Sequence, residues 1–154
     1  MCQKAAENLV AKHWDNFIYK SVPRHWYSLW CRWGPNGEIL QKFKAERIFR
    51  PDENKTYAIQ RNVYHYEDDR GTVCEGRLCG PWEIREEHNC EFGVVYPAFE
   101  SMTTIFLPGG PFAWCVRKSP FGSFFGTELC LHHGDDLRMS VGIVTQFLAA
   151  LFFY

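Results

Sequence analysis

The sequence predicts an all-β protein, an antiparallel up-and-down β-barrel of about eight or nine strands preceded by one helix. Strand-like segments recur at spacings near about ten residues, and short turns rich in glycine and proline separate them. Aromatic residues make up 17% of the 154 residues, and large rings suit a pleated, half-buried surface. These features are typical of a sandwich or a barrel. Turns between nearest neighbours favour a meander, which removes its exposed edges by closing into a barrel.

The first element expected is a helix over residues 3–17. Its apolar residues recur at steps of one, three and four, which is the spacing of one helical face. They are Leu9, Val10, His13, Trp14 and Phe17. After Pro23 the hydrophobic period changes to two, the period of a strand.

Three strands follow. Trp26–Trp33 ends at a turn that contains Asn36-Gly37, a strong hairpin signal, and Ile39–Arg50 returns from it. Thr56–Tyr66 is the third strand, after a turn rich in polar residues. Both faces of this third strand mix polar and apolar residues, so we expect one of them to look into a partly polar interior.

The second half of the chain is expected to hold the remaining strands. Thr72–Cys79 and Trp82–Glu87 are predicted as two short strands around Gly80-Pro81. Val94–Leu107 is predicted as one long strand with a bend at Pro97, because an interior proline removes a ladder hydrogen bond. The last strands are expected at 112–118, 124–132 and 137–147. We therefore expect a single domain over 1–154, with the barrel at about 25–147 and an apolar tail at 147–154.

Composition narrows the function classes. The formal net charge is -1, with 17 basic and 18 acidic residues, so no overall field favours nucleic acid. No stretch is long and apolar enough for a transmembrane helix, and residues 2–17 carry charges where a signal peptide would be apolar. We therefore expect an intracellular protein. The seven cysteines are odd in number and irregularly spaced, which indicates reduced, buried side chains rather than a disulfide framework.

The order of features resembles a known family. The helix with Asn8-Leu9 and His13-Trp14 precedes "WYSLWCRWGPNGEI" and "AERIFRPDENKTYAIQRNVY", and "TTIFLPGGPFAWCVRKSPFGSFFGTELCLHHGDDLRMSVGIV" follows. This pattern resembles a lipocalin-like (calycin) barrel, and more narrowly a poorly characterised domain-of-unknown-function family of photosynthetic organisms. The resemblance covers roughly residues 8–146. It implies an apolar ligand, such as a pigment, a tetrapyrrole or a fatty acid, and makes a chloroplast or other plastid the expected compartment.

The candidate ligand-binding residues are aromatic or charged side chains expected to face the barrel interior. They are Trp30, Phe43, Arg47, Phe49, Tyr64, Trp82, Trp114, Arg117 and Glu128. In the first strand, Trp26 and Trp30 lie on one side and Tyr27, Leu29 and Trp33 on the other. One set could fill the barrel while the other packs under the helix, or one set could line a cavity. The rings do not share one side, and no basic groove accompanies them, so a nucleic-acid stacking platform is disfavoured.

Arg47 is the most informative candidate because it shares a strand face with Phe43, Ala45 and Phe49. A charge on an apolar face needs a partner. That partner could be an internal carboxylate such as Glu128, or the carboxylate of a fatty acid or tetrapyrrole. Alternatively, strand twist could carry Arg47 to solvent.

Metal and catalytic sites are weaker hypotheses. Cys130 and His132 share a strand face and His133 points away, but a zinc site needs three or four ligands, and a Cys–His nucleophile needs a third, orienting group. His65 could ligate haem iron, although a surface histidine is the commoner case. We expect no metal and no catalytic residues.

The predicted function is therefore non-covalent binding of a small hydrophobic ligand inside a barrel. The sequence establishes no cofactor; a tetrapyrrole, carotenoid or fatty acid would fit as the bound molecule. One alternative is a barrel enzyme, an isomerase, lyase or cyclase, with Glu128, His65 or Cys115 as its titratable group. The other is a structural or assembly subunit with a filled barrel, whose function would be carried by its outer surface or by the apolar tail from Phe147, through which it could bind a protein partner.

Overall fold

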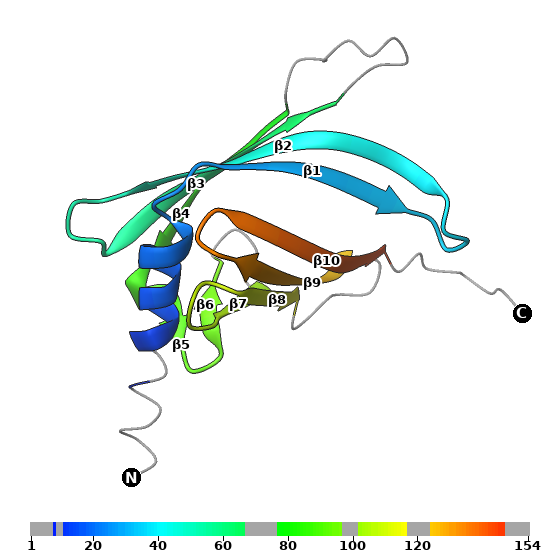
Figure 1. Cartoon of the computed structure of the whole chain (residues 1–154). Coiled ribbons are helices and arrows are strands. Elements are labelled where there is room, and N and C mark those ends of the chain that lie inside the picture. Colours follow the sequence, from blue (N-terminus) through cyan, green and yellow to red (C-terminus); the bar gives the residue numbers. More distant parts are fainter. Residues whose placement is uncertain (1–7, 9–10, 67–76, 97–101, 117–123, 147–154) are drawn as a thin grey trace, which may run out of the picture. The chain divides into compact units, whose positions relative to one another are not determined.

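The computed structural model describes residues 8, 11–66, 77–96, 102–116 and 124–146. The chain is mostly β and divides into two compact units, one formed by Met1–Ser21 with Ile84–Tyr154 and the other by Val22–Glu83. Each unit is built on its own antiparallel sheet (Figure 1). No helix in the described ranges has the length and apolar character needed to span a membrane.

The N-terminal helix is α-helical at Asn8 and over 11–16, and it continues as a π-helical turn, η1, over Phe17–Ser21. It thus ends beyond the predicted limit at residue 17, just before Pro23, whose ring cannot continue a helix. The expected apolar face is confirmed where it is described, since His13, Trp14 and Phe17 are buried. Leu9 and Val10 lie outside the described residues.

The helix is attached to the sheet of its own unit by polar and aromatic contacts. The His13 ring donates from Nδ1 to the Phe106 carbonyl oxygen at 3.1 Å. The Phe17 ring centroid lies 5.3 Å from that of Trp14 and 5.2 Å from that of Phe106. Such distances are within the favourable range for aromatic pairs, so Phe17 links the helix to the core of this unit.

The second unit holds a four-stranded sheet in the order β1-β2-β3-β4. Its strands are β1 (Trp26–Trp33), β2 (Ile39–Pro51), β3 (Tyr57–His65) and β4 (Arg77–Arg85). Gly37 has φ 83° in the β1–β2 turn, which confirms the Asn-Gly hairpin because glycine adopts positive φ without strain. Asp52 organises the β2–β3 turn, where its carboxylate accepts hydrogen bonds from the Asn54 and Tyr57 backbones and the Thr56 hydroxyl.

Strand β4 corrects the prediction of two short strands around Gly80-Pro81. It runs from Arg77 to Arg85 without interruption. The Gly80–Pro81 peptide is cis and Gly80 has φ 97°. The dipeptide that signals a turn in sequence is thus accommodated inside a strand by a backbone conformation that only glycine adopts readily.

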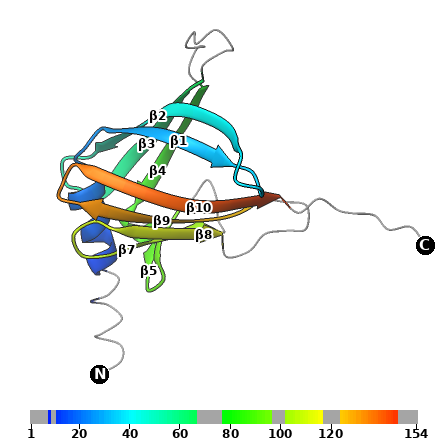
Figure 2. The ribbon, with the colours of Figure 1, turned by 45° about the vertical axis from the view of Figure 1, so that its right-hand side comes forward.

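The first unit holds a six-stranded sheet in the order β10-β9-β8-β7-β6-β5. Its strands are β5 (Asn89–Cys90), β6 (Gly93–Val95), β7 (Met102–Phe106), β8 (Phe112–Val116), β9 (Phe124–His133) and β10 (Leu137–Gln146). A short 3-10 turn, η2 (Glu86–His88), leads into it. The long neighbouring strands β9 and β10 stand out in Figure 2.

The predicted single strand Val94–Leu107 is wrong. Val94 and Val95 in β6 pair antiparallel with Thr104 and Thr103 in β7, so the chain reverses between them. The apolar pattern on both sides of Pro97 is that of two buried strands, and a continuous apolar run does not reveal a reversal.

The barrel is not confirmed. The ladders between described strands form two separate sheets of four and six strands and no closed ring. The described residues form ten strands where nine were predicted. The two predicted around Gly80-Pro81 are one strand, Val94–Leu107 is two, and β5 was not predicted. The antiparallel meander itself is confirmed within each sheet.

Candidate functional site

One face of the β1–β3 sheet gathers most of the predicted binding residues. Cross-strand pairing places Trp30 opposite Phe43, Ala45 opposite Tyr64, and Arg47 opposite both Trp26 and Asn62. Cross-strand partners point to the same side of a sheet. We call this side the aromatic face. The residues of this face that the argument uses are Trp26, Trp30, Arg32, Phe43, Ala45, Arg47, Phe49, Gln60, Asn62, Tyr64 and Tyr66.

Aromatic contacts centre on Phe43, which is buried. Its ring centroid lies 5.8 Å from that of Trp30 in a stacked arrangement, 5.9 Å from that of Tyr64 edge to face, and 5.1 Å from that of Tyr66. The Arg32 guanidinium carbon lies 5.4 Å from the centroid of the Phe43 ring. The face therefore offers flat apolar surface next to a positive charge, a combination suited to rings and to anionic groups.

A polar row runs along β3 within the same face. Gln60 Nε2 donates to Asn62 Oδ1 at 3.0 Å, and Asn62 Nδ2 donates to the Tyr64 hydroxyl at 3.2 Å. Gln60 and Asn62 are only 5% and 8% exposed, and buried amides need such partners. The prediction that one side of this strand faces a partly polar interior is confirmed.

Arg47 is half-buried on this face, between Ala45 and Phe49 along β2. Among the described residues, no carboxylate forms an ion pair with its guanidinium. The carboxylate of Glu128, the internal partner considered from sequence, accepts the Trp114 indole N–H instead. A half-buried arginine without an ion-pair partner in the described chain can accept a ligand anion without first breaking an internal salt bridge.

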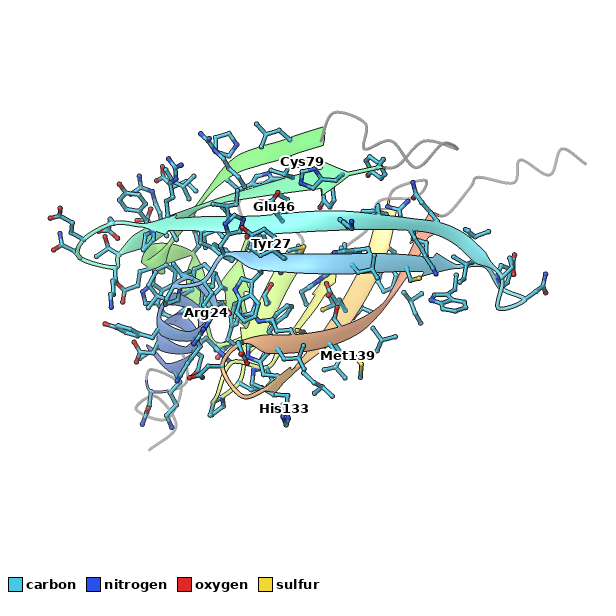
Figure 3. The ribbon with its side chains drawn as sticks, turned by 45° about the horizontal axis from the view of Figure 1, so that its top comes forward. Arg24, Tyr27, Glu46, Cys79, His133 and Met139 are labelled. Atoms are coloured by element: carbon cyan, nitrogen blue, oxygen red, sulfur yellow. The ribbon has the colours of Figure 1, made fainter. Side chains whose placement is uncertain are left out.

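The opposite face of the β1–β3 sheet carries a different set of groups, including Tyr27 and Glu46 (Figure 3). Glu46 Oε1 lies 2.7 Å from His65 Nε2, and Glu46 Oε2 lies 2.8 Å from His25 Nε2. The hydrogen bond from His65, with that from His25, lowers the pKa of Glu46 below its usual range although partial burial opposes this. We call this set the His25–Glu46–His65 cluster. It links β2 to β3 and to the residue that precedes β1, and it places His65 away from the aromatic face.

The tryptophan-rich strand β1 carries two sets of apolar side chains that differ in exposure. Trp26 is buried and Trp30 is half-buried on the aromatic face. Tyr27, Leu29 and Trp33 are 73%, 70% and 60% exposed. The two sets therefore differ in exposure, and the side chains of the second set are in contact with solvent.

The other described binding candidates lie on other strands. Trp82 is half-buried in β4. Trp114 and Glu128 are cross-strand partners in the six-stranded sheet of the other unit, where Trp114 Nε1 donates to Glu128 Oε2 at 2.5 Å. Arg117 and the apolar tail from Phe147 lie outside the described residues.

The catalytic and metal alternatives gain little from the geometry. Groups of three or more side chains able to hold a metal ion are absent from the described residues. Burial, reinforced by the nearby Arg138 charge, lowers the pKa of His132, which favours the neutral ring. Cys115 is exposed on β8, and the Glu128 side chain lies on the other side of that sheet, since Cys115 pairs with Thr127. Two of the titratable candidates for an enzyme, Glu128 and Cys115, therefore do not share one site.

Sequence reasoning missed several members of the aromatic face, among them Arg32 and Tyr66. Arg32 follows Trp30 by two residues, and Tyr66 follows Tyr64 by two. The strand period of two was the signal that could have found both, because it directs all four side chains to one side. A long arginine such as Arg32 can lay its stem along an apolar surface.

Comparison with known protein families matches residues 10–147 to the family described as "Domain of unknown function (DUF3598), N-terminal". No curated protein shows significant sequence similarity to the chain.

Proposed function

Because the chain belongs to the DUF3598 family of N-terminal domains of unknown function, we propose its function from the aromatic face: non-covalent binding of a small, largely apolar molecule that carries an anionic group. The observation that supports this most is Arg47, half-buried among aromatic and apolar side chains without a carboxylate partner in the described chain. Fatty acids and tetrapyrroles with propionate groups have this chemistry. The lipocalin-like barrel and the plastid location implied by the sequence resemblance are part of the same proposal.

The groups of the aromatic face have distinct roles in this proposal. Trp30 and Tyr64, both half-buried and both in contact with the buried Phe43 ring, supply the apolar surface. Burial of such surface contributes roughly 25 cal/mol per Å². Arg47 orients the anionic group through charge-assisted hydrogen bonds, which contribute about 1.5–3 kcal/mol each. The amides of Gln60 and Asn62 are already hydrogen-bonded along β3, so they shape the polar end of the site more than they attract the ligand.

The test compares an acid with its uncharged ester. Native mass spectrometry and tryptophan fluorescence quenching would measure binding of oleate, methyl oleate and biliverdin to the whole chain. We expect Arg47→Met to weaken oleate and biliverdin binding about 10- to 100-fold, the equivalent of one lost charge-assisted hydrogen bond. Methyl oleate should bind the variant and the native chain equally.

Arg61→Met is the matched control. Arg61 is an exposed arginine on β3, opposite Ile48 and on the other side of the same sheet. Its replacement should leave all affinities unchanged. The proposal fails if none of the three compounds binds the native chain, or if the Arg61 and Arg47 variants lose oleate affinity to the same extent.

A further inference from the structure

The six-stranded sheet exposes an apolar surface that the binding proposal does not use. Strand β10 exposes Leu137, Met139, Val141 and Ile143 by 60%, 74%, 72% and 64%, and β9 exposes Leu129 and Leu131 by 48% and 53%. The pairs Met139–Leu131 and Val141–Leu129 put the two strands' apolar residues on one side. We call this side the β9–β10 apolar face. In Figure 3, Met139 is labelled on β10 and His133 on β9.

This face carries no formal charge over its described part. On the same side of β8, β9 and β10 the pairing places Ala113, Cys115, Thr127 and His133, but no lysine, arginine, aspartate or glutamate among the described side chains. The one arginine of β10, Arg138, points to the other side. There its guanidinium donates to the Ser21 hydroxyl at 3.3 Å and lies over the Phe112 ring.

Strand β10 is also the edge of its sheet in the described ladders. Natural edge strands are usually protected by lysine, proline, a bulge or a covering element. The β10 segment "LRMSVGIVTQ" contains no proline, and its pairing with β9 runs without a register shift. An apolar, regular edge strand of this kind is a candidate association surface.

The size of the face suits contact with a second copy. Full burial of an aliphatic side chain contributes about 1.5–3 kcal/mol, at roughly 25 cal/mol per Å². Each fully exposed aliphatic side chain therefore presents about 60–120 Å² of apolar surface. The six exposed side chains of the face therefore present roughly 200–450 Å² at their measured exposure. A standard interface buries about 800 Å² per partner, and a little over half of that is apolar. The face thus supplies much of the apolar part of one such interface.

Absence of charge favours a copy of the same chain over a charged partner. In a two-fold symmetric contact the same patch meets itself, so a charge near its centre would face its own copy. A partner recognised by charge would instead require opposite charges here. We propose that two copies of this chain pack through their β9–β10 apolar faces, related by a two-fold axis.

Sedimentation velocity of the whole chain over a range of concentrations tests this contact. We expect a reversible dimer of twice the chain mass of 18.1 kDa. Val141→Glu and Met139→Glu should each weaken the dimer at least about tenfold, because each buries an unpaired carboxylate in the contact. Ser140→Glu is the matched control, since Ser140 is an exposed residue of the same strand on the opposite side.

Oxidative footprinting supplies a readout that does not depend on a variant. Oxidation of Met139 should fall as the dimer forms, while oxidation of the exposed Tyr27 should not change. A monomer at all concentrations would overturn the proposal, as would a dimer that Ser140→Glu weakens as much as Val141→Glu, which would indicate strand pairing at the edge. A monomer that binds phosphatidylcholine vesicles through Met139 would also overturn it and would assign the face to lipid. Oleate binding by the Val141→Glu chain separates this outcome from that of the Arg47 site.

Discussion

At the scale of single residues, two charged side chains of β2 differ in the ion-pair partners that the described residues give them. Glu46 is held between two histidines at 2.7 and 2.8 Å, whereas no described carboxylate pairs with Arg47 on the other side of the same strand. Both are half-buried members of β2. Their neighbours across the ladder decide the difference, and those neighbours come from β1, β3 and the residue before β1.

Glu46 therefore contributes to stability in a pH-dependent way. Its pKa is lowered in the folded state, so its contribution is present above its ordinary pKa of 4.5. That contribution is lost as the pH falls through the lowered value. We expect Glu46→Gln to reduce the free energy of unfolding by about 0.5–1 kcal/mol at pH 6, the range for partly exposed ion pairs.

Urea denaturation at pH 6 and pH 3 checks this prediction. The loss caused by Glu46→Gln should be smaller at pH 3, where the native carboxylate is itself becoming protonated. Glu53→Gln, at an exposed turn residue, should have no effect at either pH. An equal loss at both pH values would show that the charge of Glu46 contributes nothing.

At the scale of elements, the N-terminal helix depends on its contact with the sheet of its own unit. Short helices are marginal alone and gain stability from packing of an apolar face. Phe17 is fully buried between Trp14 and Phe106. The helix was predictable because its apolar period is local, but its contact with β7 was not, since Phe106 lies far along the chain.

We expect Phe17→Ala to lower the free energy of unfolding by about 3–5 kcal/mol, because it leaves a cavity in a packed core. Tyr19→Ala, two residues further along and 53% exposed, should cost less than about 1 kcal/mol. Chemical denaturation followed by circular dichroism measures both. Similar losses for the two variants would mean that the helix does not pack through Phe17.

At the scale of the whole molecule, the cysteines show how composition and tertiary structure differ. The five described cysteines are free, as expected, but only Cys130 is buried while Cys31 and Cys115 are exposed. The expectation of mostly buried thiols is thus wrong for these two. Strand alternation places them on the solvent-exposed sides of their sheets. Amino-acid composition does not indicate on which side of a sheet a residue lies.

This difference predicts selective alkylation. Under native conditions iodoacetamide should modify Cys31 rapidly, whereas Cys130, which is 2% exposed, should react only after denaturation. Peptide mass spectrometry over a time course gives both rates. Comparable rates in the native protein would contradict the placement of Cys130 in the core of the six-stranded sheet.

The sequence by itself determined where most strands and the helix lie, because hydrophobic period and turn residues are local signals. It also predicted Trp30, Phe43, Arg47 and Tyr64 as inward-facing candidates, but their position on one side of one sheet follows from the cross-strand pairing. Only the tertiary structure decided that the chain reverses between β6 and β7, that β4 passes through Gly80-Pro81, and that Trp114 binds Glu128. Each of these depends on which strands pair and in what register, and pairing is set by contacts between residues far apart in the chain, which no local pattern specifies.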